Sequence, residues 1–146
     1  MDKIVTILLV EDDDVDAMAI ERSFIKHRIA NPIIRAHDGK SALEMLRSNK
    51  VDSPYIILLD LNMPRMGGIE FLESIRKDVS LKRSVVFVLT TSKDDKDVVA
   101  AYDNFVAGYF IKEDSGIGFH NVVELLSGYW KIVHLPDKDP NKKLIK

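Results

Sequence analysis

Short apolar runs recur along the chain, and longer segments with helical spacing separate them. The first run, IVTILLV at residues 4–10, is rich in β-branched residues and ends at four consecutive acidic residues. This pattern is typical of a strand that is buried on both faces, as in a parallel sheet. Similar runs predict four further strands: PIIRA (32–36), YIILLD (55–60), SVVFVLT (84–90) and GYFIK (108–112).

Apolar residues spaced three and four positions apart predict a helix after each strand. These helices are expected around residues 17–24, 42–46, 69–75, 94–105 and 118–133. The alternation implies right-handed crossovers and a parallel sheet with helices on both faces. The predicted fold class is α/β, a flavodoxin-like (βα)5 three-layer sandwich with strand order 2-1-3-4-5, because a barrel needs eight units and roughly 250 residues.

Composition restricts the class of protein further. The 146 residues are 46% hydrophobic and 30% charged, as in one globular domain, and no run is long enough to span a membrane. A net charge of −2 gives no basic field for nucleic acid, and the absence of a signal peptide favours a cytoplasmic protein. Cysteine is absent, which excludes disulfides and thiolate chemistry. We expect one domain over residues 1–136 and a mobile polar tail over residues 137–146.

Polar residues stand at the carboxyl ends of the predicted strands, where open α/β sheets bind their ligands. Glu11 and Asp12 follow the first strand, Asp60 ends the third, Thr90 ends the fourth and Lys112 ends the fifth. Clustered carboxylates repel one another unless a cation lies among them, and oxygen ligands with room for water suit Mg²⁺. An aspartate in such a site can attack phosphorus.

Each of these residues also has an ordinary structural interpretation. The acidic run fits a helix start that Asp13 or Asp14 caps, and Asp60 fits a turn before LNMPRMGG at residues 61–68. Thr90 is equally a β-branched strand residue, and Lys112 a solvated charge. Their coincidence at one edge of the sheet favours a functional site. The main-chain carbonyl of Asn62 is a further candidate metal ligand.

Four motifs occur in order: LLVEDD (8–13), LLDLNMPRMGG (58–68), VLTTS (88–92) and GYFIK (108–112). Together they resemble a two-component response-regulator receiver domain, over about residues 4–133. The resemblance implies a phosphorelay protein in which a sensor histidine kinase phosphorylates Asp60 in a Mg²⁺-dependent reaction. Self-phosphorylation and self-dephosphorylation would be its only chemistry, so the chain is not expected to be an enzyme in the usual sense.

The resemblance also implies a role for each matching residue. Asp12 would bind Mg²⁺ directly together with Asp60, Glu11 would act mainly through metal-bound water, and Asn62 would offer its main-chain carbonyl. Thr90 would bond a phosphoryl oxygen and follow it inward, while Lys112 pairs with the phosphate.

Two positions near the end of the last predicted strand need separate comment. Tyr109 matches the aromatic switch residue of the family, although an ordinary half-buried strand tyrosine is the alternative interpretation. Glu113 stands where the family usually has proline after the lysine, often in a cis bond. Because a cis bond before a non-proline residue costs about 2.5–4 kcal/mol, we expect a trans bond and a loop of its own over residues 113–118.

Output is expected to pass through protein contacts, since only about thirteen residues follow Val133, too few for a DNA-binding domain. The ending SGYWKIVHLP resembles standalone receivers that include phytochrome-partner response regulators, whose last strand and helix support a homodimer. Apolar residues cover much of the last helix, which predicts a second surface for it to pack on, and a deeper core within the chain is the alternative interpretation. The two stripes are Val122, Leu126, Tyr129 and Val133, and Val123 with Trp130.

Two other functions remain open from the residues alone. An aspartate-nucleophile phosphatase of the haloacid dehalogenase type also uses Asp, Lys, Thr and Mg²⁺, but its DxD motif would have Asn62 in place of the second Asp. Flavodoxin-like cofactor binding predicts a phosphate loop rich in Ser, Thr and Gly after the first strand. This chain has acidic residues there.

Overall fold

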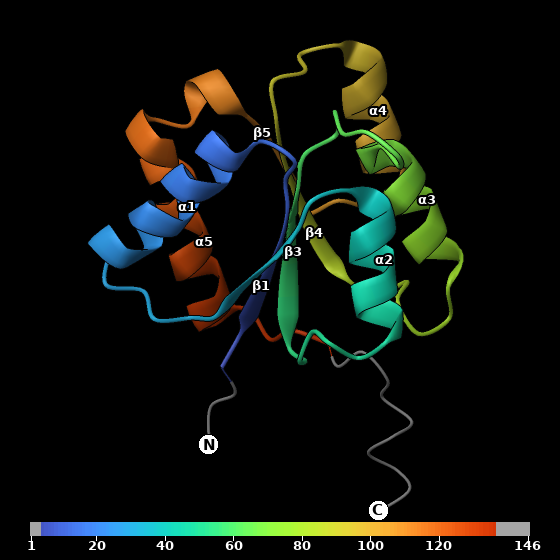
Figure 1. The fold of residues 1–146 in the computed structure, drawn as a ribbon, viewed down its shortest axis with the longest axis horizontal. Coiled ribbons are helices and arrows are strands. Elements are labelled where there is room, and N and C mark those ends of the chain that lie inside the picture. The colour runs from blue at the N-terminus through green and yellow to red at the C-terminus, as the bar shows by residue number, and fades with distance from the viewer. Residues whose placement is uncertain (1–3, 137–146) are drawn as a thin grey trace, which may run out of the picture.

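A five-stranded parallel sheet forms the centre of the computed structural model, which describes residues 4–136 (Figure 1). The strand order is β2-β1-β3-β4-β5, which confirms the predicted fold class and order. Every residue of β1 and β3 is buried, because helices cover both faces of the sheet. The strands are β1 (Thr6–Val10), β2 (Ile33–Ala36), β3 (Tyr55–Leu59), β4 (Val85–Thr90) and β5 (Gly108–Ile111).

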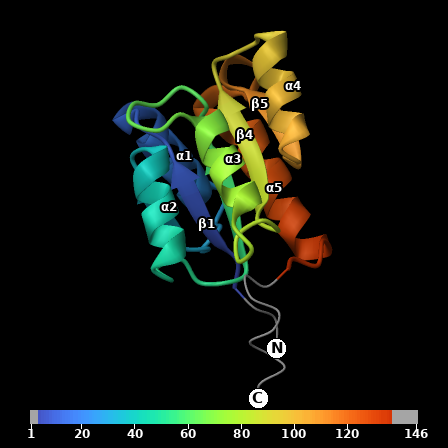
Figure 2. The same ribbon diagram turned by 90° about the vertical axis from the view of Figure 1, so that its right-hand side faces the viewer.

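Five helices form the two outer layers. One face of the sheet is covered by α1 (Asp14–Lys26) and α5 (His120–Ile132), and Figures 1 and 2 show the other three helices on the opposite face. Those are α2 (Gly39–Arg47), α3 (Gly68–Lys77) and α4 (Asp95–Asp103). The sheet therefore separates two apolar cores, and its carboxyl edge is left for polar side chains.

The predicted elements all form, but several ends differ from the prediction. The first strand begins at Thr6 instead of Ile4, whose side chain is 71% exposed. The last strand ends at Ile111, and two short 3-10 turns, Lys112–Asp114 and Ile117–Phe119, lead into α5. These turns give residues 113–118 their own path.

The peptide bond between Lys112 and Glu113 is trans, as expected. Within residues 4–136 the only cis bond is Ser53–Pro54.

Most apolar residues of α5 pack in a core within the chain, the alternative to a partner surface. Val122, Val123 and Leu126 are buried in the core that α5 shares with α1, and Tyr129 and Trp130 pack against that core. The ring centroids of Phe24 and Trp130 lie 6.1 Å apart. The wide apolar surface of α5 is therefore used mainly inside the chain.

No helix within residues 4–136 is both long and apolar enough to cross a membrane. The predicted tail, residues 137–146, lies outside the described residues.

Candidate functional site

Two buried carboxylates lie side by side at the carboxyl ends of β1 and β3. The Glu11 backbone N–H donates to the Ala36 carbonyl at 3.0 Å, and the Asp60 N–H donates to the Val10 carbonyl at 3.0 Å. The sheet pattern thus continues one residue beyond each strand and fixes both backbones. Only 1% of Glu11 and 6% of Asp60 is exposed.

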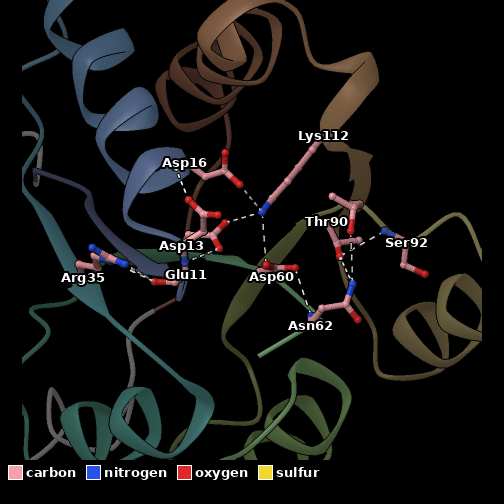
Figure 3. Close-up of polar contacts among 10 residues, drawn as sticks. Glu11, Asp13, Asp16, Arg35, Asp60, Asn62, Thr90, Ser92 and Lys112 are labelled. Atoms are coloured by element: carbon pink, nitrogen blue, oxygen red, sulfur yellow. Dashed lines mark hydrogen bonds and ion pairs between the residues drawn. The ribbon is translucent and has the colours of Figure 1, made fainter. Parts of the chain in front are cut away.

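Lys112 points into this edge from the end of β5 and contacts three acidic side chains (Figure 3). Its Nζ lies 2.8 Å from Glu11 Oε1, 2.7 Å from Asp16 Oδ2 and 3.3 Å from Asp60 Oδ2. An ammonium has three donor hydrogens, so each can be directed to one carboxylate. The Lys112 side chain is 10% exposed, which makes this a largely desolvated ionic network.

Asp16 is the member of this network that the sequence prediction missed. It lies in the first turn of α1, and its backbone N–H donates to the side chain of Asp13 at 3.0 Å. Asp13 is therefore the helix cap, one of the two expected caps. The contact between Asp16 and Lys112 joins residues 96 positions apart, and no local pattern indicates it.

Burial changes the acidity of the network. Burial and, to a smaller extent, the negative charge of Asp60 raise the pKa of Glu11 from 4.5 to about 8, although the hydrogen bond from Lys112 opposes the shift. Burial alone would lower the pKa of Lys112, but its hydrogen bonds to Asp16 and Glu11 outweigh that effect and raise it. The metal-free site therefore keeps its lysine charged and favours a proton on Glu11.

The acidic cluster, defined here as Glu11, Asp12 and Asp60, has the donor set of a hard-cation site. Each residue offers one carboxylate oxygen, and the three oxygens lie within 4.8 Å of one another. Asp12 is exposed whereas the other two are buried, so the cluster is open toward solvent on one side. Oxygen-only donors with an open side fit Mg²⁺ or Mn²⁺, which keep several waters.

Arg35 holds the loop that carries the acidic cluster. Its Nε and one terminal nitrogen donate to the Glu11 carbonyl at 3.0 and 2.9 Å, and its other terminal nitrogen pairs with Asp14 at 2.8 Å. A guanidinium bound in this forked way fixes orientation as well as charge.

The loop after β3 returns tightly against Asp60, and Gly68 makes this possible. A Cβ atom on Gly68 would lie 2.6 Å from Leu61 Cα and 2.7 Å from the Asp60 carbonyl oxygen. Any other residue would displace that backbone. The glycine pair of the LNMPRMGG motif therefore allows α3 to begin directly beside the acidic residue.

Thr90 lies on the other side of Asp60, at the end of β4, and is fully buried. Its Oγ1 lies 3.5 Å from Asn62 Nδ2 and 3.4 Å from the Ser92 backbone nitrogen, both long contacts (Figure 3). The backbone N–H of Asn62 donates to Asp60 Oδ1 at 3.2 Å. The Asn62 backbone N–H thus binds the Asp60 oxygen that Lys112 does not contact, and the Thr90 hydroxyl and the Asn62 amide contact each other beside it.

Tyr109 contacts the same loop from β5. Its hydroxyl donates to the Ser92 carbonyl at 2.9 Å, and partial burial raises its pKa. A second link joins the loops after β4 and β5, because Glu113, the residue in place of the usual proline, forms an ion pair with Lys93. The loop that follows Thr90 is therefore joined to β5 through Tyr109 and to the segment after Lys112 through Glu113.

Known proteins match both the sequence and the fold. The family model described as the response regulator receiver domain matches residues 7–122, most of the chain. The chain belongs to this family.

Individual relatives agree with the family match. The chain is 39% identical over 127 residues to the probable methanogenesis regulatory protein FilR2 of Methanothrix harundinacea, across 85% of this chain and 82% of that protein. It is 34% identical over 135 residues to response regulator Rcp1 of Synechocystis sp., across 89% of this chain and 92% of Rcp1.

Solved structures of similar receivers agree as well. The Mn²⁺-bound form of Rcp1 superposes with a TM-score of 0.78, covering 90% of this chain and 98% of that chain. The phosphorylated cyanobacterial phytochrome response regulator RcpA is 30% identical and has a TM-score of 0.79 over 90% of this chain and 98% of its own.

Membership of the receiver family makes this chain a phosphorelay response regulator, not a classical enzyme. The likeness to Rcp1 and RcpA confirms the resemblance to phytochrome-partner regulators. The haloacid dehalogenase alternative receives no support.

Proposed function

We propose that this receiver accepts one phosphoryl group on Asp60 from the phosphohistidine of a sensor histidine kinase. The observation that carries the proposal is the arrangement around Asp60: a buried carboxylate, 6% exposed, with the Lys112 ammonium at 3.3 Å and the hydroxyl of buried Thr90 nearby. An oxygen of Asp60 forms the new bond to phosphorus while the bond from phosphorus to the imidazole nitrogen breaks, and that nitrogen keeps the electron pair.

Mg²⁺ is the proposed cofactor, held by the acidic cluster and the main-chain carbonyl of Asn62. When bound, the cation neutralises phosphoryl oxygens and the repulsion among the carboxylates. As a carboxylate, Glu11 would be a ligand of the cation or would orient a water molecule bound to it. Lys112 pairs with one phosphoryl oxygen and Thr90 donates to another, so the chain contributes position and charge.

Asp16 binds the Lys112 ammonium when no phosphoryl group is present. The ammonium is closer to Asp16, at 2.7 Å, than to Asp60, at 3.3 Å. A phosphoryl group on Asp60 competes with Asp16 for the same ammonium, and Lys112 turns toward the stronger charge. Asp16 is thus a positioning residue for Lys112.

The switch is proposed to pass through Thr90 and Tyr109. Movement of the Thr90 hydroxyl toward phosphate shifts the loop after β4, whose Ser92 carbonyl holds the Tyr109 hydroxyl. Tyr109 therefore changes position with that loop, and a protein partner detects the altered surface.

The phosphoryl acceptor is tested by incubating the chain with acetyl phosphate and Mg²⁺ and measuring its intact mass. The wild type gains the mass of one phosphoryl group, and Asp60→Asn gains none. Asp52→Asn, which alters an exposed aspartate before β3, serves as the matched control and gains the group normally. A gain that persists in Asp60→Asn contradicts the proposal.

A homodimer through β5 and α5 is the proposed assembly. Apolar side chains that are exposed on or next to α5 support it: Leu125 is 50%, Ile132 88% and Val133 38% exposed. Light scattering at high concentration, with and without beryllofluoride as a phosphoryl mimic, tests it. A monomer under both conditions rules it out.

A further inference from the structure

A second group of metal-binding side chains lies away from the phosphoryl site, where α1 ends and α5 begins. We call His27, His120 and Glu124 the histidine cluster. Each offers one ligand atom, and the three atoms lie within 4.8 Å of one another. His27 and His120 are 93 positions apart in the sequence, yet their ring centroids lie 4.4 Å apart.

The geometry points to a binding site for one divalent transition-metal ion of the zinc class at the histidine cluster. Two imidazoles and one carboxylate are a donor set that zinc accepts, with the fourth position left to water. The acidic cluster has no nitrogen donor, so the two groups differ in the class of ion they prefer.

The orientation of His27 fits a ligand. Its Nδ1 lies 2.7 Å from the Ser23 carbonyl oxygen, which can only accept a hydrogen bond. Nδ1 therefore donates to this carbonyl, and Nε2 is the ring nitrogen available to a metal ion. Metal-binding histidines are commonly oriented by such a bond from the other ring nitrogen to a carbonyl.

The spacing on α5 also fits. His120 and Glu124 are four residues apart, so they project from the same side of the helix. His120 Nε2 lies 3.0 Å from Glu124 Oε2. Ligand atoms about 2.0–2.1 Å from a tetrahedral zinc ion are about 3.3 Å apart, so this pair needs only a small adjustment.

Both helix ends are held in place without a metal. At the end of α1, the Ile29 backbone N–H donates to the Phe24 carbonyl at 2.9 Å and turns the chain away. At the start of α5, the Asn121 N–H donates to the Ser115 carbonyl at 3.1 Å. The ligands therefore stand on fixed backbones, and the side chains are accessible: His120 is 49% and Glu124 66% exposed.

An ion at this position would link α1 to the first turn of α5. That turn follows Lys112 by only the short segment 113–119, so the ion would fix the far end of the segment that begins at the phosphoryl-binding lysine. The ion pair between His120 and Glu124 accounts for the closeness of these two side chains without a metal. It does not account for the position of the His27 ring beside them.

Calorimetric titration of the tag-free chain with Zn²⁺ tests the site, in buffer with saturating Mg²⁺ to occupy the acidic cluster. We expect one equivalent of Zn²⁺ to bind, and His27→Ala and His120→Ala each to weaken that binding by at least about tenfold. Co²⁺ bound at the same site should give intense visible d–d bands, as expected for tetrahedral coordination, and these bands should disappear in the same variants.

His37→Ala is the matched control, because His37 is an exposed histidine directly after β2 and belongs to neither cluster. Its zinc affinity should equal that of the wild type. Glu124→Gln keeps the shape of the side chain and should give an intermediate loss. Zinc binding that is unchanged in both His27→Ala and His120→Ala overturns the proposal, as does the absence of binding to the wild type.

Discussion

The acidic cluster and the histidine cluster each bring three potential ligands together, but they do so in opposite surroundings. The acidic cluster lies at the ends of buried strands, with Glu11 1% exposed. The histidine cluster joins two helix ends and is largely exposed. Desolvation therefore acts on the first and scarcely on the second.

This difference explains why the acidic cluster is suited to chemistry. Two of its three carboxyl groups, those of Glu11 and Asp60, are buried beside Lys112, where electrostatic interactions are strong. The histidine cluster lies in contact with solvent, where electrostatic interactions are weaker. Changes at the acidic cluster should alter phosphoryl transfer strongly, and changes at the histidine cluster should not.

Replacing Lys112 should have the largest effect on phosphoryl transfer. Lys112→Met should slow phosphoryl transfer to Asp60 by about 10²–10³-fold, the loss expected when a preorganised donor to the transition state is removed. The rate is measured from intact masses after quenching. Lys93→Met removes an exposed lysine of the neighbouring loop and should change the rate by less than about twofold. Equal rates in Lys112→Met and the wild type would refute the role of this lysine.

The affinity for Mg²⁺ should depend on pH through Glu11. A cation displaces the proton that burial keeps on this carboxyl group, whose pKa is raised to about 8. Affinity should rise by up to about tenfold per pH unit as the pH approaches that value. Titrations of the wild type and of Glu11→Gln measure it, and the variant should lose this dependence. A wild-type affinity that is flat with pH would contradict the argument.

The free energy of unfolding of the metal-free chain should fall as the pH rises, whereas the affinity for Mg²⁺ rises. Because the Glu11 pKa is about 8 in the folded chain and 4.5 in the reference state, the folded chain binds more protons between these values. The contribution of Glu11 is fully present below about pH 4.5 and is lost as the pH rises through about 8, at most about 1.4 kcal/mol per unit. Urea unfolding with a chelator measures this slope, and Glu11→Gln should reduce it.

The sequence predicted the elements and most of the site because those depend on local patterns. The apolar run before Glu11 and the run before Asp60 mark buried strands, and the carboxyl-end rule then places both acids at one edge. The contact between Asp16 and Lys112 was not predicted, because it depends on how α1 packs and joins residues 96 positions apart. The spacing of Leu126 left two interpretations open for a related reason, since amphipathic spacing does not tell whether the partner surface lies inside the chain, where Leu126 is buried.

Replacing Asp16 should have a smaller effect on phosphoryl transfer than replacing Lys112. Asp16→Asn removes the charge that competes for Lys112, so phosphoryl transfer should become about two- to fivefold faster, the equivalent of one modest hydrogen bond. Asp14→Asn removes the same charge from the same helical turn, but Asp14 pairs with Arg35, so its rate should not rise. A rate that rises equally in both variants would indicate a general charge effect.

Changes in the histidine cluster should have the smallest effect on the rate of phosphoryl transfer. His120→Ala should leave the rate of phosphoryl transfer within about twofold of the wild type, because an exposed side chain away from Asp60 contributes little to its charge environment. The same rate assay measures it in metal-free and zinc-containing buffer. A large loss in the metal-free assay would show that the two clusters are not separate.

The central claim is that the phosphoryl group forms an acyl phosphate on Asp60. Borohydride reduces an acyl phosphate to an alcohol, so treatment of the phosphorylated chain should convert Asp60 to homoserine, and peptide mass spectrometry locates the change. We predict homoserine at residue 60 and unmodified aspartate at residues 12 and 16. Conversion at another residue, or a phosphoryl group that resists this reduction, would contradict the account.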